Sequence, residues 1–268
     1  MSRVATVIQA RTGSTRLPGK VLLPAAGKPL LALMIERVRR ARLAGTVVLA
    51  TTVEPVDRIV EELGRGLGVE TYCGHPTDCL DRHVRAARVV DADVVVKIPS
   101  DCPLIDPAVI DRVLEVFLND PERYDYAGNL HPESYPDGND VEVMSRQALE
   151  TAWSEAQRPY EREHTTPFLW DQPERFRIGS HVWEKGLDLS RVHRWVLDYP
   201  EDYVLIRTVF ERLLPVRPQF NLEDILALME REPALAGLNR MHIGRSWISR
   251  HQGELRTGPA GVPRGAGA

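Results

Sequence analysis

The sequence predicts an α/β protein in which a mostly parallel sheet lies between two layers of helices, and three observations support this prediction. Short apolar, β-branched runs alternate along the chain with longer amphipathic stretches, as in parallel strands joined by helices. Glycines end two of the early amphipathic stretches, at Gly45 and Gly68. Residues that suit phosphate and metal binding follow directly after buried strands, where open α/β sheets bind their ligands.

The individual elements follow from the apolar periods. The first strand is the run 4–10, which carries no charge before Arg11. A helix at 30–43 follows, with Leu30, Leu33, Met34, Val38 and Ala41 on one face, and the basic residues Arg37, Arg39, Arg40 and Arg42 are expected on its solvated face. Further strands are expected at 46–52, 69–72, 93–98, 141–144 and 194–198, and further helices at 55–67, 78–90, 107–118, 145–156, about 200–214 and 220–232.

No linker divides the chain, so one domain is expected over residues 1–252. Its middle part, about 124–190, is less regular than the rest and is typical of an insertion. Within it, the polar, proline-bounded run 158–167 predicts a functional loop or a subunit contact. The stretch 253–268 is rich in Gly, Pro and Arg and has no apolar period, so a disordered tail is expected there.

Composition excludes several classes of protein. With 268 residues, 43% hydrophobic and 27% charged, the chain has the make-up of an ordinary globular protein. A net charge of −4 argues against a general nucleic-acid binder, and the lack of an apolar run of about 18 residues argues against a membrane protein. The three cysteines, Cys73, Cys79 and Cys102, form no Cys-x-x-Cys pair. Reduced thiols and a cytoplasmic location are therefore expected.

The loop after the first strand is the strongest functional signal. It carries Arg11, Arg16 and Lys20 together with two glycines and several hydroxyl groups, at the carboxyl end of a buried strand. The guanidinium groups of arginine and the ammonium group of lysine neutralise phosphate, and glycines let the backbone approach a phosphate closely. The spacing from Gly13 to Lys20 differs from that of the ATPase phosphate loop, and Val21 stands where Ser or Thr is required. A polyphosphate site is predicted; the alternative is a surface turn with scattered basic residues.

Two aspartates complete this prediction. Asp101 and Asp198 each follow a predicted strand, so both should lie at the same sheet edge as the basic loop. Alone, Asp101 could be a turn residue and Asp198 could cap the helix that starts near Pro200. Together they form the carboxylate pair that Mg²⁺ uses alongside substrate phosphates. A metal-assisted nucleoside triphosphate site is therefore expected.

Other polar residues give weaker signals. Asp91 and Asp93 form an Asp-x-Asp pattern, known from metal-dependent glycosyltransferases, but precede their strand and are expected in a solvated turn. Two acidic residues that alternate along a strand could border the site or pair with arginines. Three residues of the run 158–167 could bind an anionic acceptor or form a solvated or intersubunit salt network. The acidic pair is Asp140 and Glu142, and the second set is Arg158, Arg162 and His164.

These motifs, in this order, resemble the cytidylyltransferase family that includes CMP-Kdo and CMP-sialic acid synthetases, and above all its SpsF-like branch. The resemblance extends over about residues 4–242. It is carried by Gln9-Ala10-Arg11-x-Gly13-Ser14-Thr15-Arg16-Leu17-Pro18-Gly19-Lys20, by Ser100-Asp101-Cys102-Pro103, by Tyr135-Pro136-Asp137-Gly138-x-Asp140-Val141-Glu142, by Arg162-Glu163-His164-x-Thr166-Pro167 and by Leu197-Asp198-x-Pro200-Glu201-Asp202.

The resemblance implies a nucleotide-diphospho-sugar transferase fold, which is GT-A-like and Rossmann-like, with CTP as substrate and Mg²⁺ as cofactor. It also implies a homodimer and makes 124–190 the acceptor or dimerisation segment. Asp101 and Asp198 would hold the metal and, with Arg11 and Lys20, form the catalytic set. The implied nucleotide-binding residues are Gln9, Ala10, Arg11, Gly13, Ser14, Arg16, Lys20, Arg82 and Ser100, of which Ser100 departs from the expected glycine.

The sequence therefore predicts transfer of CMP from CTP to an acceptor oxygen, with release of pyrophosphate, in the synthesis of surface polysaccharide or glycoconjugate precursors. An anionic acceptor such as a sugar acid or a phosphonate would suit Arg158 and Arg162. One alternative is a glycosyltransferase of similar fold that uses a nucleotide-sugar donor. Another is a nucleotide-binding module without catalysis.

Overall fold

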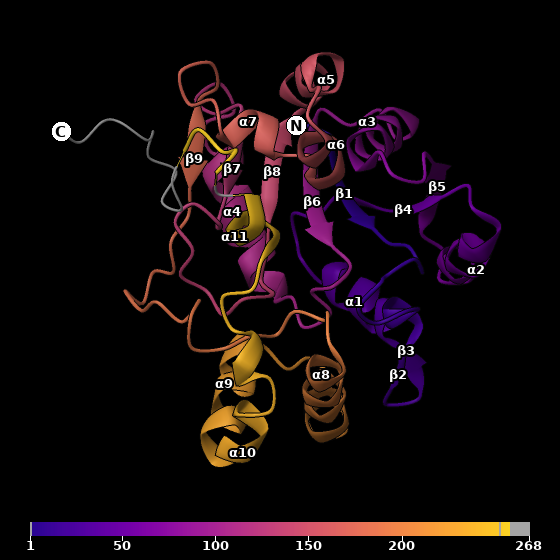
Figure 1. The fold of residues 1–268 in the computed structure, drawn as a ribbon, viewed down its shortest axis with the longest axis vertical. Coiled ribbons are helices and arrows are strands. Elements are labelled where there is room, and N and C mark those ends of the chain that lie inside the picture. The colour runs from indigo at the N-terminus through magenta and orange to yellow at the C-terminus, as the bar shows by residue number, and fades with distance from the viewer. Residues whose placement is uncertain (1, 252, 258–268) are drawn as a thin grey trace.

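The computed structural model describes residues 2–251 and 253–257 and consists of a central sheet with helices on both faces (Figure 1). The strands lie in the order β5-β4-β1-β6-β8-β7-β9, and among them only β8 runs antiparallel to its neighbours. A short hairpin, β2 (Pro24–Ala25) and β3 (Lys28–Pro29), lies outside this sheet. The strands of the sheet are β1 (Val4–Gln9), β4 (Thr46–Thr52), β5 (Glu70–Gly74), β6 (Val94–Pro99), β7 (Tyr126–Gly128), β8 (Glu142–Ser145) and β9 (Ile178–Ser180).

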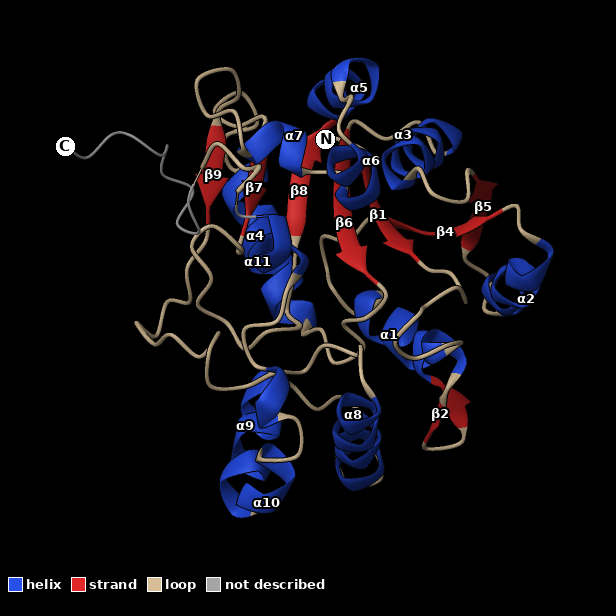
Figure 2. Cartoon of the chain, viewed as in Figure 1, coloured by secondary structure: helices blue, strands red, loops and turns tan. Residues whose placement is uncertain are grey.

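The helices form two layers and a separate group, as Figure 2 shows. One layer contains α1 (Leu30–Val38), α2 (Arg58–Gly66) and α4 (Pro107–Leu118). The other contains α3 (Cys79–Val89), α5 (Arg146–Glu155), α6 (Pro159–His164), α7 (Pro167–Trp170) and α11 (Trp247–His251). Beyond the carboxyl end of β6 lie α8 (Pro200–Leu213), α9 (Leu222–Arg231) and α10 (Pro233–Ala236). Single 3-10 turns are formed by Lys20–Leu22, Pro55–Asp57 and Arg240–His242.

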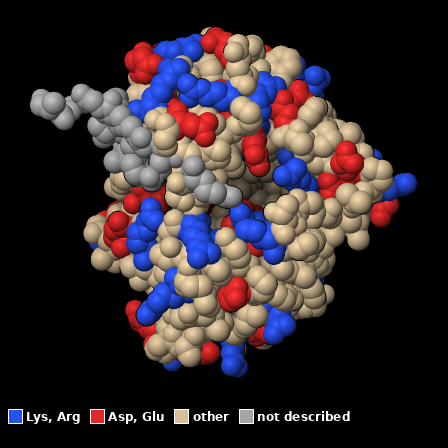
Figure 3. Space-filling model, in the orientation of Figure 1, with Lys and Arg blue, Asp and Glu red and all other residues tan. Residues whose placement is uncertain are grey.

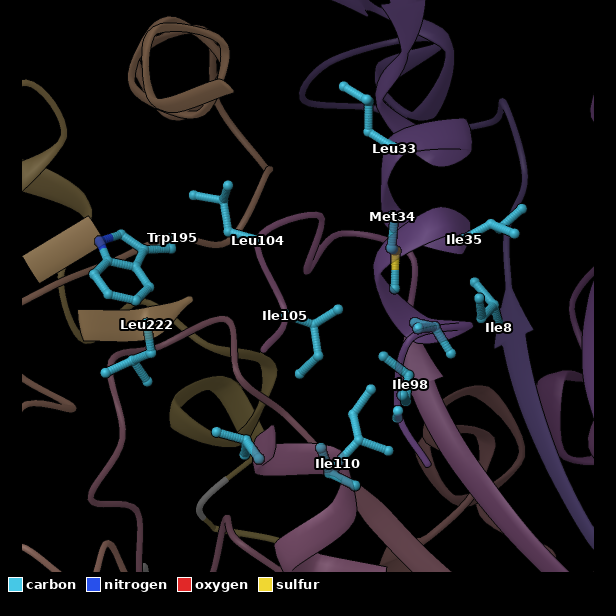
Figure 4. Packing of buried hydrophobic residues seen from close by; sticks show 14 of the residues in the cluster. Ile8, Leu33, Met34, Ile35, Ile98, Leu104, Ile105, Ile110, Trp195 and Leu222 are labelled. Carbon is cyan, nitrogen blue, oxygen red and sulfur yellow. The ribbon is translucent and has the colours of Figure 1, made fainter. Parts of the chain in front are cut away.

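Alternating side chains of the strands build a core on each face of the sheet. In β1, Ile8 packs into the layer of α1 and α4, whereas Ala5 and Val7 pack into the layer of α3 and α5. Figure 4 shows Ile8 and Ile98 close to Met34 and Ile105 in the first of these layers. Strands covered on both faces have apolar side chains throughout, which explains the near-continuous apolar runs in the sequence.

The order of the strands fixes where a ligand can bind. From β1 the chain proceeds outward through β4 to β5, and it then returns to place β6 on the other side of β1. The connections therefore diverge between β1 and β6, and a crevice opens at the carboxyl ends of these two strands. These ends are Gln9 and Pro99, directly before the two motifs that the sequence analysis singled out.

The predicted fold class is confirmed, with local differences. Residues 194–198 do not form a strand of the sheet; they contribute one isolated bridge, between Arg194 and Asp137. Two short strands, β7 and β9, were not predicted because three residues carry too little periodicity. The run 158–167 is mostly helical, in α6 and the start of α7, instead of a loop.

The C-terminal segment is more ordered than its composition suggests. Leu255 and Thr257 are buried, and Asp171 accepts hydrogen bonds from the backbone N–H groups of Arg256 and Thr257 at 3.0 and 2.7 Å. The predicted disorder is therefore wrong for 253–257, while 258–268 lie outside the described residues.

Among the described helices, none has the length and apolar character needed to cross a membrane.

Arg37 is the exception on the predicted solvated face of α1. Its side chain is buried, and it donates hydrogen bonds to the carbonyl oxygens of Ile105, Phe220 and Leu104 at 2.8, 3.1 and 3.3 Å. The guanidinium also lies 4.2 Å from the centre of the Phe220 ring. Arg37 thus fastens the loop after β6 and the segment before α9 to α1, because among the described residues no other donor supplies those three carbonyls.

Replacing Arg37 by Met should lower the free energy of unfolding by about 3 kcal/mol, since three buried carbonyl groups lose their donor. Urea unfolding followed by circular dichroism measures this loss. Arg39→Met is the matched control, because Arg39 is exposed and donates one hydrogen bond, to Leu67. Equal stability of the two variants would contradict the role assigned to Arg37.

Candidate active site

A cleft of about 780 Å³ opens at the carboxyl ends of β1 and β6. In Figure 3 a hollow lies in the middle of the face, with side chains of both charges at its rim. The cleft contains nearly every residue that the sequence predicted for the site. These are Gln9, Ala10, Arg11, Gly13, Ser14, Arg16, Lys20, Arg82, Ser100, Asp101, Asp140, Glu142, His164 and Asp198. A second depression, of about 710 Å³, lies beside α5 and contains none of them.

The basic loop is folded back on itself by a few backbone contacts. The Gly19 N–H donates to the Thr12 carbonyl at 3.0 Å, and the Thr12 N–H and hydroxyl both donate to Asp57 at 2.6 Å. Gly19 adopts a left-handed conformation with φ of 66°, which a residue with a β-carbon adopts only with strain. Closing the loop in this way turns Lys20 toward the centre of the cleft, while Arg11 stays exposed.

Lys20 lies between the two predicted metal ligands. Its ammonium donates to Asp198 at 2.9 Å, to Asp101 at 3.3 Å and to the carbonyl of Leu197 at 2.7 Å. Burial alone would lower the pKa of Lys20, but the two carboxylates outweigh burial and raise it. Lys20 is therefore charged and holds two carboxylates together that would otherwise repel each other.

Asp198 is the most strongly paired carboxylate of the cleft. Besides Lys20, Arg16 lies 2.6 Å from one of its oxygens and Arg194 donates to the other at 3.1 Å. Burial would raise the pKa of Asp198, but the neighbouring cations Lys20 and Arg16 lower it to about 2. The cap role that the sequence left open for Asp198 is wrong: Tyr199 precedes α8, and Asp202 accepts the Tyr199 N–H at 2.9 Å.

Arg194 is a site residue that the sequence analysis missed. It is buried, and it pairs with Asp137 at 3.0 Å, with Asp198 at 3.1 Å and with Asp202 at 3.3 Å. Arg194 directly precedes the apolar residues 195–197, and a buried cation requires acidic partners. This charge beside an apolar run was the signal in the sequence that could have identified Arg194. Its partners come from distant parts of the chain, so the sequence pattern could not name them.

The motif around Asp137 forms the floor of the cleft. Gly138 has φ of 110°, and a β-carbon there would come within 2.8 Å of the Trp195 backbone. This close approach lets the Trp195 N–H donate to the Asp137 carbonyl at 2.7 Å. Burial raises the pKa of Asp137 to about 7, although Arg194 opposes the shift. Burial and the carboxylates of Asp137 and Asp101 also raise the pKa of Asp140.

Glu142 is bonded within the protein at the base of the cleft. It forms a short, buried ion pair with Lys97, and it accepts hydrogen bonds from the hydroxyls of Tyr126 at 2.9 Å and Thr166 at 2.5 Å. Burial would raise the pKa of Glu142, but Lys97 lowers it. Asp140 lies before β8 rather than in it, and its side chain accepts only a 3.3 Å hydrogen bond from the Gly138 N–H among the described residues.

Two predicted acceptor ligands do not line the cleft. Arg162 pairs with Asp78 and donates to the Trp153 carbonyl at 2.6 Å. Arg158 donates to the Tyr160 hydroxyl at 2.6 Å and to the Glu254 carbonyl at 3.1 Å. The salt-network alternative thus describes Arg162, whereas His164 of the same run does line the cleft.

Two further expectations agree with the structure. Asp91 and Asp93 lie before β6 and pair with Arg3, at 2.7 and 3.0 Å, so the Asp-x-Asp pattern is a solvated turn outside the cleft. The three cysteines are free thiols. Cys79 lines the cleft and lies 3.6 Å from His83, which lowers the pKa of the thiol to about 6 although burial opposes this.

The carboxylates present fit a divalent cation. The Lys20 ammonium already occupies a cation position between Asp101 and Asp198, and carboxylate oxygens are the donors that Mg²⁺ prefers. Among the described residues, no group of three or more His, Cys, Asp or Glu side chains has the geometry of a complete metal site. The pair therefore fits a metal that is shared with substrate phosphates.

Fold and cleft together define a nucleotidyltransferase. The sequence model of one family, described as cytidylyltransferase, matches residues 5–232, and the chain belongs to this family. Spore coat polysaccharide biosynthesis protein SpsF of Bacillus subtilis is 28% identical over 247 residues, which cover 88% of this chain and 98% of that protein. The 3-deoxy-manno-octulosonate cytidylyltransferase of Trichlorobacter lovleyi is 39% identical over 119 residues, which cover 44% of this chain and 46% of that protein.

A solved structure agrees with this assignment. A cytidylyltransferase from Leptospira borgpetersenii superposes with a TM-score of 0.83 at 30% identity, and the match covers 92% of this chain and 99% of the other. The resemblance inferred from the motifs is thereby confirmed at the level of family and fold.

The pairing of Asp198 predicts how stability depends on pH. Its pKa of about 2 in the folded protein lies below the unfolded value near 3.8, so pairing stabilises the fold above about pH 4 and is lost as the pH falls toward 2. Asp198→Asn should therefore lower the free energy of unfolding by about 2–3 kcal/mol at pH 7 and by about half as much at pH 3. Urea unfolding at both values measures the difference.

The control is Asp93→Asn, which removes an exposed surface partner of Arg3. We expect this variant to change the free energy of unfolding much less than Asp198→Asn does, because solvent screens an exposed ion pair. An Asp198→Asn penalty that stayed constant from pH 7 to pH 3 would contradict the assigned pKa.

Proposed function

We propose that this protein transfers CMP from CTP to an oxygen of an anionic acceptor, such as a sugar acid, with Mg²⁺ as cofactor and pyrophosphate as the second product. The observation that carries the proposal is the group of Lys20, Asp101 and Asp198 at the carboxyl ends of β1 and β6. The names of two relatives, one acting in polysaccharide biosynthesis and one on a sugar acid, support a role in surface polysaccharide precursor synthesis.

The nucleotide would lie along the basic loop. Arg11, Ser14 and Arg16 line the cleft, where their side chains would bind the triphosphate together with backbone N–H groups of the loop. Arg82 lines the same end of the cleft and is held by the carbonyl oxygens of His75 and Pro76, at 2.5 and 3.2 Å. The Gln9 side-chain oxygen is buried without a hydrogen-bond partner among the described residues, so it can accept a hydrogen bond from the base.

In the reaction, the acceptor oxygen forms a bond to the α-phosphorus while the bond from that phosphorus to the bridging oxygen breaks. The bonding electrons leave with pyrophosphate, and the acceptor proton is released to solvent. Mg²⁺ bound to Asp101 and Asp198 would neutralise phosphate charge and lower the pKa of the acceptor hydroxyl. Lys20 and Arg11 stabilise the charge that develops on pyrophosphate, and Lys20 also keeps the two carboxylates in position before substrates bind.

Two further properties stay predictions. The resemblance implies a homodimer in which the segment 124–190 contributes to acceptor binding or to the subunit contact. A cytoplasmic location is expected because an activated precursor is made where CTP is available. Sedimentation velocity of the purified chain tests the dimer directly.

The function is tested by incubating the protein and Mg²⁺ with each of the four nucleoside triphosphates and a panel of sugar acids that includes 3-deoxy-manno-octulosonate. We expect pyrophosphate release with CTP alone among the four, and loss of activity when the metal is chelated. Asp101→Asn and Asp198→Asn should each lower kcat/KM by about 100-fold or more, because the metal loses a ligand and Lys20 loses a partner.

Asp93→Asn is the control here as well and should leave kcat/KM unchanged, since Asp93 lies outside the cleft. Sugar transfer from a nucleotide-sugar donor, with no pyrophosphate release under any combination, would overturn the proposal in favour of a glycosyltransferase.

A further inference from the structure

The carboxylate pair that fits a metal already has a cation between its two members. The Lys20 ammonium lies 2.9 Å from Asp198 and 3.3 Å from Asp101, and it also donates to the Leu197 carbonyl at 2.7 Å. An ammonium has three N–H donors, so each of them has an acceptor. The Lys20 side chain is only 12% exposed, and water therefore offers little replacement for these three contacts.

A divalent metal on the same two carboxylates is incompatible with these contacts. Mg²⁺ binds carboxylate oxygens directly, at shorter range than an ammonium does. An ammonium that kept its hydrogen bonds to the same oxygens would face a doubly charged ion at close range, in a partly buried place where repulsion is weakly screened. Lys20 and a metal ion therefore compete for Asp101 and Asp198.

Of the three cations around Asp198, Lys20 is the one placed to leave the carboxylate pair. The side chain of Arg194 is 1% exposed and pairs with two further carboxylates, so Arg194 is fixed. Among the described residues, Arg16 pairs with Asp198 and with no second carboxylate, so its departure would not free the place between the pair. Lys20 has a flexible four-carbon chain and belongs to the basic loop, on the side where a polyphosphate would bind.

The free-energy cost of moving Lys20 depends on its new partners. A metal ion alone would leave a mostly buried ammonium without its carboxylates, which is unfavourable. A polyphosphate in the basic loop offers its oxygens to the same ammonium, because lysine binds phosphate as a mobile point charge. Polyphosphate binding therefore favours metal binding at the two carboxylates. By linkage, the metal favours polyphosphate binding by the same factor.

We propose that Lys20 is an internal counter-cation that keeps divalent metals off Asp101 and Asp198 until a polyphosphate draws its ammonium away, so that metal and triphosphate bind together. This inference rests on the placement of the triphosphate and the metal in the proposed function, but it is independent of the base and of the acceptor. Free divalent cations are thereby kept from the carboxylate pair, and the metal is bound only in the presence of a polyphosphate.

The first test measures the binding of Mn²⁺ alone, from the loss of the free-ion signal in electron paramagnetic resonance. Lys20→Met should bind Mn²⁺ about tenfold more tightly than the wild-type protein, because the carboxylates lose their competing cation. Arg16→Met is the matched control, since it removes one positive charge beside Asp198 but leaves Lys20 between the carboxylates. It should raise the affinity by about threefold or less. An unchanged affinity in Lys20→Met, or an equal gain in Arg16→Met, overturns the inference.

Thermal unfolding gives a second readout that does not depend on catalysis. MgCl₂ and inorganic tripolyphosphate together should raise the melting temperature of the wild-type protein by more than the sum of the two separate shifts, because each ligand favours the other. In Lys20→Met this excess should disappear, and MgCl₂ alone should raise the melting temperature by about 3 °C or more. Additive shifts in the wild-type protein overturn the inference, and this result holds even where Lys20→Met folds poorly.

These measurements separate the inference from the proposed function. If no triphosphate yields pyrophosphate with any acceptor, the proposed function fails, while the Mn²⁺ and melting results still decide the role of Lys20. If CTP turns over but Lys20→Met binds Mn²⁺ no more tightly than the wild-type protein, the inference fails and the proposed function stands.

Discussion

The constraint on which the site depends is the balance of charge around Asp198. Lys20 comes from the first loop, Arg16 from the same loop, and Arg194 from the segment before α8, and each donates to or pairs with this one carboxylate. Segments nearly 180 residues apart in the chain are thereby joined at the floor of the cleft. A buried carboxylate without such partners would be protonated or would destabilise the fold. The cations that hold the carboxylates of the site in place are also the groups that a triphosphate needs.

The order and direction of the strands made the position of Asp101 beside the basic loop predictable. Asp101 follows β6 directly, and parallel strands end at the same edge, so its place beside the basic loop follows from the apolar run before it. Asp198 lies at the same edge of the sheet, but it does not follow a strand of the sheet. Residues 194–198 are not a strand but are held by single hydrogen bonds, from Trp195 to Asp137 and from Leu197 to Asp101, both at 2.7 Å. The two aspartates therefore lie close together as expected, although the strand expected at 194–198 is not part of the sheet.

The rest could not be predicted because it depends on contacts between distant segments. The sequence shows that Arg37 and Arg194 carry charge, but burial of either depends on carbonyls or carboxylates from other elements. Arg158 and Arg162 appeared suited to an anionic acceptor, and the structure gives both of them partners within the protein. Composition predicted disorder from residue 253, yet Leu255 is buried because Asp171 supplies hydrogen-bond acceptors for the residues that follow it.

The residues that line the cleft come partly from within the family match at 5–232 and partly from beyond it. Lys20, Asp101 and Asp198 lie within the match, so membership of the family bears on the nucleotide. The segment 245–249 lines the cleft from beyond the match, and Arg158 and Asp171 fasten the residues that follow it. This segment also contacts the charged group, because Arg194, which pairs with Asp198 at 3.1 Å, donates to the Arg245 carbonyl at 3.2 Å. Substitutions in this segment are therefore coupled to the charge balance around Asp198, since the two share Arg194 as a partner.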